Sequence, residues 1–383
     1  MSDSTIPVSV LGEAHKRFVM VTTLLSLIDP VRGEPTTHSL DKHPHDDAWT
    51  HERLQKKFLD SFALISSTSG ISGDTASAIC LEQGHPSGTI LRLARNSGVS
   101  QDLIDQLQEI LDDLTAIALK GMIVEDLHHK ILHKIIALVE DRIRSLLKKL
   151  NQPKIHETIE RAMKKISNEK RLSDDAGEVR FRQWICNLPV LASLGHEIKC
   201  AQLIAQVQWA SEARWVYSEQ LGSFLEFEDE EMPAWLKTIY KLGRYYTATK
   251  TMIKLAQKQP DVFTGIHLEP VEAPKQVNFS LRKDQKPLLT VLKKITETDP
   301  EKLKVKLGQI WLREDPELWF RQACHVKLTV HAEMQLLSFY DHNPNLTPRL
   351  LFMGTSKKAC YLCHEFMSRH PLAIKKDAGG VRD

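Results

Sequence analysis

Two short motifs near the end of the chain bring three zinc-binding side chains to a defined spacing. His331-Ala332-Glu333 supplies an imidazole and a carboxylate, and Cys360-Tyr361-Leu362-Cys363 supplies two thiols. Imidazole and thiolate are ordinary zinc ligands, and a catalytic zinc site takes three protein ligands and leaves a fourth position for water. A zinc site at His331, Cys360 and Cys363 therefore requires a fold that joins two segments distant in the sequence.

The residues around His331 predict that a strand turns into a helix there. Apolar and polar residues alternate over 326–330, which predicts a half-buried strand, and Met334 and Leu337 continue at helical spacing. Residues two apart share a side in extended chain but diverge inside a helix. The junction therefore lets His331 and Glu333 converge on one metal ion and its bound water.

The residues around the two thiols predict a second junction of the same kind. Residues 350–353 form a continuous apolar run, which is typical of a strand buried on both faces. After a turn at 354–356, residues 360–367 predict a short helix ended by Pro371. Cys360 and Cys363 then lie near a helix N-terminus, where the helix dipole favours the thiolate form.

Residues 326–367 resemble the zinc-dependent cytidine deaminase-like superfamily. More narrowly, they resemble fungal proteins with a nucleic acid/nucleotide deaminase domain related to bacterial toxins. The narrower likeness rests on His-Ala-Glu-Met-Gln-Leu-Leu at 331–337, on Ser-Lys-Lys-Ala-Cys-Tyr-Leu-Cys at 356–363, and on the helical region upstream. Ala359 stands where the superfamily pattern has Pro before the first Cys.

The resemblance implies roles for four residues. His331, Cys360 and Cys363 would hold Zn²⁺, and Glu333 would move protons between the zinc-bound water and a departing amine. The substrate would be a free base, a nucleoside or nucleotide, or an exposed base in a nucleic acid strand. The resemblance also implies a small three-layer α/β/α domain. Because the family's fold continues beyond the thiol helix, this domain is expected to be shortened at its C-terminus.

The same residues allow other interpretations. A lone Cys-x-x-Cys could be a redox pair or half of a structural zinc knuckle. A structural zinc site has four protein ligands, and the fourth could be Cys324, His325, His364 or His370. The chain would then be a catalytically inactive interaction module. Glu333 favours the enzyme, since a structural site needs no carboxylate beside the metal.

Upstream, the sequence predicts a mostly helical region. Residues 102–150 and 235–257 carry apolar side chains at helical spacing, and residues 260–274 have the composition of a linker. We therefore predict a helical region at 1–262, with a sub-boundary near 172–178, and a zinc deaminase-like domain at 275–383. Residues before about 260 should contain no extended sheet. Leu91, Leu93 and Ala94 should belong to a helix closed by the turn signal at 96–98.

Two histidine pairs in this upstream region are weaker metal candidates. His43 and His45 flank a proline in a polar stretch that predicts a solvated loop. His129 and His133 lie one helical turn apart, which allows chelation but is also common on a hydrated helix face.

Composition and charge indicate an intracellular protein with no global nucleic-acid signature. The formal net charge is +2, and six cysteines are scattered without a disulfide-like spacing, which suits a reducing compartment. No secretory signal is evident, and the apolar run at 18–28 is too short to span a bilayer. Residues 276–383 hold eighteen Lys and Arg against twelve Asp and Glu, so an anionic substrate would be attracted. The sequence does not specify protein partners for the helical region.

Overall fold

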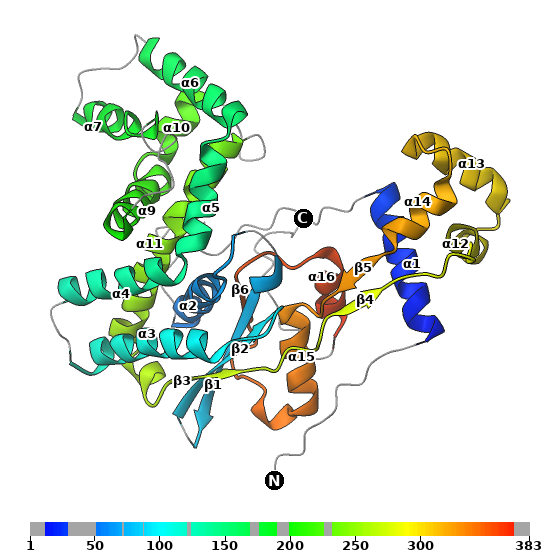
Figure 1. Cartoon of the computed structure of the whole chain (residues 1–383). Coiled ribbons are helices and arrows are strands. Elements are labelled where there is room, and N and C mark those ends of the chain that lie inside the picture. The colour runs from blue at the N-terminus through cyan, green and yellow to red at the C-terminus, as the bar shows by residue number, and fades with distance from the viewer. Residues whose placement is uncertain are drawn as a thin grey trace, which may run out of the picture. The chain divides into compact units, whose positions relative to one another are not determined.

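The computed structural model of the chain describes residues 12–29, 51–70, 73–86, 88–120, 124–168, 176–189, 199–225 and 232–370. Helices make up most of this part, together with two small sheets (Figure 1). The described residues form two compact units. The smaller unit contains residues 12–29, 274–330 and 360–362, and the larger unit contains the remaining described residues. None of the described helices is both long and apolar enough to cross a bilayer.

The larger unit is mainly helical. Its helices before residue 260 are α2 (His51–Ser66), α3 (Gln101–Lys120), α4 (Val124–Leu138), α5 (Glu140–Leu150), α6 (Pro153–Asn168), α7 (Ala176–Ile185), α9 (Cys200–Trp215), α10 (Ser218–Leu225) and α11 (Ala234–Lys258). The long helix α11 packs against α2, α3, α4, α5 and α9, and the apolar faces of these helices form one core. The helices predicted over 102–150 and 235–257 are therefore confirmed.

The larger unit also contains a four-stranded mixed sheet. Its strands are β1 (Ser77–His85), β2 (Gly88–Arg95), β3 (His267–Pro270) and β6 (Gly354–Thr355), in the order β3-β2-β1-β6. β1 is antiparallel to β2 and β6, and β2 is parallel to β3. Ala78 pairs with Thr355, so a strand from the first quarter of the chain lies beside the segment that leads to the thiols.

The prediction of a helix at Leu91, Leu93 and Ala94 is wrong, because these residues lie in β2. The expectation of no extended sheet before residue 260 has one exception, because the β1–β2 hairpin contributes two strands to the four-stranded sheet. Its strands are buried on both faces, so their apolar residues run together and the period of two that marks a half-exposed strand is lost.

Each face of this sheet is covered by helix. Ile79 and Leu81 on β1 face the helical core that includes α2, whereas Ala78 and Cys80 face α15 (Ala332–His342). Alternate strand residues point to opposite faces, so the sheet lies between two helical layers. The sheet and the helices on its two faces, α15 among them, therefore form the three α/β/α layers that were predicted.

A buried polar network fixes the far end of α15 on the sheet. The Tyr340 hydroxyl donates a hydrogen bond to the Glu82 carboxylate over 2.8 Å, and Arg92 donates to both oxygens of the same carboxylate over 2.9 Å. Arg92 also bonds Glu269 on β3. Because these buried charges are paired and hydrogen-bonded, they hold α15 in one register on β1 and β2.

The segment before the thiols, around β6, packs between α2 and β1. The Asp60 carboxylate accepts a hydrogen bond from Thr355 N over 2.9 Å, and Ser77 N donates to Ser356 Oγ over 3.0 Å. The strand expected at 350–353 lies instead at Gly354–Thr355. Phe352 and Met353 are nevertheless buried, in the cores on opposite sides of the sheet. The apolar run therefore indicated buried residues correctly but did not indicate where the strand begins and ends.

We predict that Gly354→Ala lowers the free energy of unfolding by about 1–3 kcal/mol, the usual cost of overpacking. A Cβ at this position would lie 2.3 Å from the Leu59 carbonyl carbon, so α2 and β6 would have to separate. Chemical denaturation measures the change. The control is Gly222→Ala on α10, where a Cβ meets no atom within 4 Å and where Ala is favoured in a helix. Equal stabilities of the two variants would contradict the packing described here.

The smaller unit is a helical cluster with a two-stranded ribbon. Its elements are α1 (Glu13–Ile28), β4 (Val277–Phe279), α12 (Pro287–Ile295), α13 (Pro300–Trp311), α14 (Pro316–Ala323) and β5 (Val326–Leu328), and β4 is antiparallel to β5. Leu24, Leu288 and Phe320 are buried in its core. The Glu317 carboxylate accepts a hydrogen bond from Leu288 N over 2.8 Å and so satisfies the start of α12. The strand predicted over 326–330 is present as β5.

Candidate metal centre

The first part of the centre is the N-terminus of α15. His331 is the N-cap of this helix and has extended backbone angles, φ −66° and ψ 150°, which confirms the predicted junction. The His331 ring makes no capping hydrogen bond. The first backbone N–H of the helix, at Ala332, instead donates to Asn96 Oδ1 over 2.7 Å. The cap is thus supplied from the end of β2, and the imidazole can point elsewhere.

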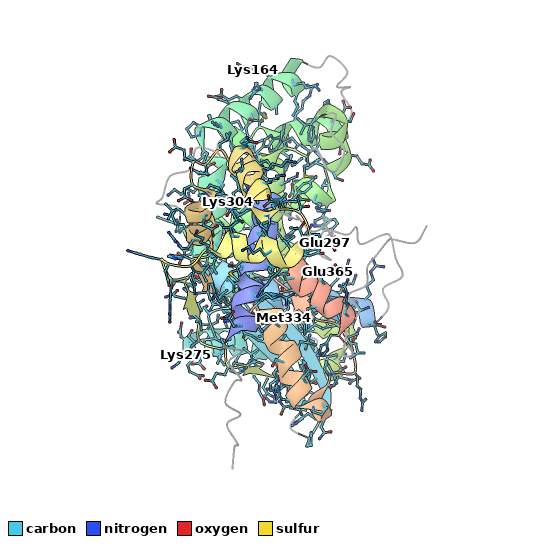
Figure 2. All side chains as sticks on the ribbon, turned by 90° about the vertical axis from the view of Figure 1, so that its right-hand side faces the viewer. Lys164, Lys275, Glu297, Lys304, Met334 and Glu365 are labelled. Atoms are coloured by element: carbon cyan, nitrogen blue, oxygen red, sulfur yellow. The ribbon has the colours of Figure 1, made fainter. Side chains whose placement is uncertain are left out.

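The second part is the start of α16 (Tyr361–Arg369). Cys360 immediately precedes this helix, and Cys363 lies in its first turn. Cys363 is buried and Cys360 is exposed. The predicted helix at 360–367 is confirmed as far as Arg369, whereas Pro371 lies outside the described residues. Met334 marks the first turn of α15 and Glu365 the middle of α16 in Figure 2.

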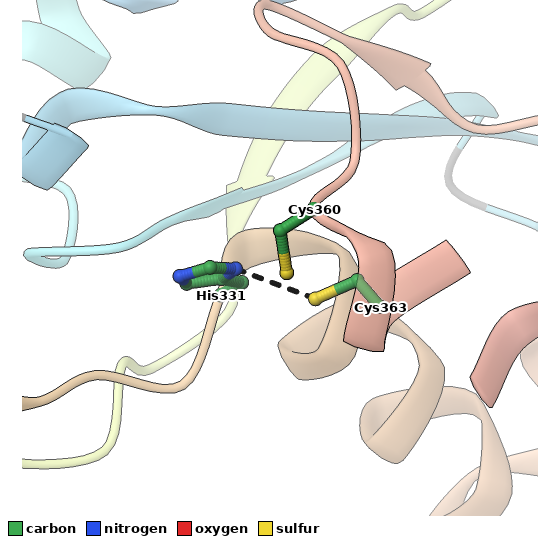
Figure 3. Close-up of side chains that lie close together, drawn as sticks. All are labelled: His331, Cys360 and Cys363. Carbon is green, nitrogen blue, oxygen red and sulfur yellow. Dashed lines mark hydrogen bonds between the residues drawn. The ribbon is translucent and has the colours of Figure 1, made fainter. Parts of the chain in front are cut away.

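The structure brings the three predicted ligands together. One imidazole nitrogen of His331 and the sulfurs of Cys360 and Cys363 all lie within 4.8 Å of one another. His331 Nδ1 is 3.3 Å from Cys363 Sγ (Figure 3). Zinc bonds of about 2.1 Å to nitrogen and 2.3 Å to sulfur in a tetrahedron place such atoms about 3.5–4 Å apart. The donor set and its spacing therefore fit a zinc ion.

Glu333 lies in the first turn of α15, two residues after the imidazole, and only 7% of its surface is exposed. Among the described residues, the group of mutual metal-ligand neighbours consists of His331, Cys360 and Cys363 and does not include this carboxylate. The carboxylate is thus buried close in the sequence to His331 without belonging to the ligand group.

In the part of the chain that the structure describes, none of the alternative fourth ligands joins the group. Cys324 is buried in the core of the smaller unit, where burial raises its pKa to about 11. His370 pairs with Asp341 over 3.1 Å and stacks on Phe366. His325 and His364 are likewise absent from the group. A site closed by four protein ligands therefore has no support from the described residues.

The upstream histidines form no comparable centre within the described ranges. His133 contacts Cys200 at 3.8 Å, and no third ligand joins this pair in a group. His129 stacks edge-on against His128. His43 and His45 lie outside the described residues.

Comparison with known proteins found a match in the segment that contains the candidate ligands. The model of the family described as OTT_1508_deam, a deaminase-like family, matches residues 330–381. The match contains His331, Glu333, Cys360 and Cys363, and its last residues, 371–381, lie outside the described part. No curated protein and no solved structure matched the chain.

Sequence reasoning missed Asn96, which joins three segments at the centre. Its backbone N donates to Ala76 O, its Nδ2 donates to Gly73 O over 2.9 Å, and its Oδ1 accepts from Ala332 N. Asn96 was identified only as a turn residue. The contact with Ala332 spans most of the chain, so no local pattern could reveal it. Because metal-binding histidines depend on partners that fix their orientation, Asn96 belongs to the support of the centre.

We predict that Asn96→Ala weakens zinc binding about 10- to 100-fold, the range typical of residues that orient metal ligands. The variant leaves the Ala332 N–H buried without its acceptor and loosens the start of α15. Competition with a chromophoric chelator measures the affinity. Asn343→Ala is the matched control, because Asn343 donates one hydrogen bond to Phe339 O at the other end of α15. Equal losses of zinc affinity in both variants would contradict the orienting role.

Proposed function

We propose that this chain is a zinc-dependent hydrolytic deaminase that acts on a nucleobase-containing compound. The observation that carries the proposal is the group of one imidazole and two thiols at the starts of α15 and α16. It lies within the residues matched by a deaminase-like family, beside a buried carboxylate. A group of three protein ligands leaves one coordination position for water, as catalytic zinc sites do.

The proposed roles of the ligands follow from their positions. His331, Cys360 and Cys363 would hold the metal, and zinc bound there would supply a water whose pKa is lowered to about 7. Ala332 and Leu336 pack α15 against the sheet, and Asn96 satisfies its first N–H. These contacts keep the imidazole in place, because α15 cannot shift without breaking them.

Glu333 would carry the proton. The net reaction forms a bond from the base carbon to the water oxygen and breaks the bond from that carbon to the amine nitrogen. Glu333 would accept a proton from the water and deliver it to the departing nitrogen, which leaves as ammonia. Burial of the carboxylate, with 7% of its surface exposed, limits exchange of that proton with solvent.

The experiment that tests the proposal measures ammonia release by the zinc-loaded protein. The panel contains cytosine, adenine and guanine compounds as free bases, nucleosides, nucleotides and single-stranded oligonucleotides. We expect release from at least one of these classes. Release from none of them, with zinc bound, would favour a catalytically inactive interaction module.

A further inference from the structure

A cluster of cations lies on the larger unit at the end of the sheet that carries the metal centre. Arg95 is the last residue of β2, and its neighbour Asn96 bonds the first residue of α15. Gln335 Nε2 on the first turns of α15 donates to Arg95 O over 3.2 Å. Lys357 precedes Cys360 by three residues, so their Cα atoms are at most about 11 Å apart. The backbone at Arg95 and Lys357 is therefore close to the two helix starts that carry the proposed ligands.

The guanidinium of Arg95 is incompletely satisfied. Its terminal nitrogen donates to Thr68 Oγ1 over 2.8 Å, but its Nε is buried without a hydrogen-bond acceptor. Within the described ranges no carboxylate forms an ion pair with Arg95. Burial lowers the pKa of this guanidinium, and no neighbouring charge offsets that effect. A buried donor without an acceptor is unfavourable. A bound anion near this half-buried guanidinium would offset its charge and could supply an acceptor.

Arg142 contacts the same loop, and Lys357 lies within electrostatic range of Arg142. Arg142 on α5 donates to Ser67 Oγ over 3.2 Å and to Ser69 O over 3.0 Å, and it forms no ion pair with a carboxylate among the described residues. The pKa of Lys357 is lowered by burial and then by the charges of Arg142 and Lys149, although Asp74 acts in the opposite direction. Repulsion among these cations would be relieved by a bound anion.

The loop that Arg95 and Arg142 contact is fixed in position. Residues 67–70 read Ser-Thr-Ser-Gly, and a Cβ at Gly70 would lie 2.3 Å from Ser145 Cβ on α5. The loop backbone therefore lies directly on the helix that carries Arg142. Hydroxyl groups held beside two guanidinium groups form a donor set suited to phosphate oxygens.

We propose that Arg95, Arg142, Lys357 and the 67–70 loop form a subsite for a phosphate group of the substrate. The inference rests on the proposed deaminase function, because it places the phosphate of a nucleotide, or of a nucleic acid strand, beside the centre that acts on the base. The subsite would make a phosphorylated compound a better substrate than the corresponding nucleoside.

The test compares binding of three probes to the zinc-loaded full chain by isothermal titration calorimetry. The probes are a nucleoside, its 5′-monophosphate, and a single-stranded oligonucleotide without a terminal phosphate. We expect the wild-type protein to bind at least one phosphate-containing probe more tightly than the nucleoside, with an affinity that falls as salt rises. Tighter binding of the 5′-monophosphate would indicate a subsite for a terminal phosphate, and tighter binding of the oligonucleotide would indicate a subsite for a phosphodiester.

Arg95→Gln is expected to weaken that binding about 10- to 100-fold, the loss typical of one charge-assisted hydrogen bond. Nucleoside binding, zinc content and melting temperature should stay unchanged, which a merely structural role would not allow. Lys164→Gln removes the same charge from an exposed face of α6 and should have no effect. Lys357→Gln gives a second test should Arg95→Gln fail to fold.

The outcomes separate this inference from the proposed function. Unchanged phosphate binding in both Arg95→Gln and Lys357→Gln would overturn the subsite, even if the protein releases ammonia. Equal binding of the nucleoside and both phosphate-containing probes by the wild-type protein would overturn it as well. Phosphate binding that these variants weaken, in a protein that releases no ammonia, would support the subsite and contradict the deaminase.

Discussion

Replacing Glu333 by Gln is expected to lower the rate of ammonia release by about two to four orders of magnitude, the usual contribution of general acid–base catalysis. The amide is close in size to the carboxylate but cannot accept a proton and return it. Because Glu333 lies outside the ligand group, the variant should keep its zinc and its melting temperature. Single-turnover ammonia release, measured beside zinc content, checks all three expectations.

Glu365→Gln is the matched control for this variant. Glu365 lies on α16, the helix of the thiols, and pairs with Arg369 of the same helix. Its replacement also removes one carboxylate and should leave the rate of ammonia release unchanged. Loss of zinc from Glu333→Gln would identify the carboxylate as a fourth ligand. The site would then be closed, and the proposed mechanism would fail.

The second large effect is the loss of metal when the thiols are removed. The double variant Cys360→Ser, Cys363→Ser is expected to lose essentially all zinc, and His331→Ala is expected to bind zinc far more weakly than the wild-type protein. Each residue is one of only three proposed protein ligands, and a site with fewer ligands is open and labile. Elemental analysis after dialysis measures the zinc content.

The control for this loss is the double variant Cys186→Ser, Cys200→Ser, which removes two thiols outside the ligand group. It should retain about one zinc per chain, as expected for a single three-ligand site. Full zinc occupancy in the Cys360→Ser, Cys363→Ser variant would place the metal elsewhere and contradict the assignment.

Helical spacing predicted the helices well because their cores form along one face of each helix. Leu103, Leu107 and Ile110 follow the helical repeat predicted over 102–150 and are all buried on α3. The hairpin of β1 and β2 could not be found in the same way, since both of its faces are covered. The pairing of Ala78 with Thr355 depends on tertiary structure and has no local signal. The division into a helical region at 1–262 and a deaminase-like domain at 275–383 stays a prediction.

The candidate site was predictable where chemistry restricts residue type. An imidazole and two thiols at this spacing have few other uses, and the structure places His331, Cys360 and Cys363 together. The residues that hold the ligand-bearing helix in place were not predictable. An asparagine after a strand, such as Asn96, is also an ordinary turn residue. The roles of Arg95 and Arg142 likewise follow only from the neighbours that folding gives them.

The most direct test of the account is to measure zinc occupancy and ammonia release in the same samples while metal-free protein is reconstituted with zinc. We predict that the rate of ammonia release rises in proportion to bound zinc and reaches its maximum at about one zinc per chain, as expected for a single three-ligand site. Samples that bind zinc fully at His331, Cys360 and Cys363 yet release no ammonia from any compound of the panel would contradict a deaminase.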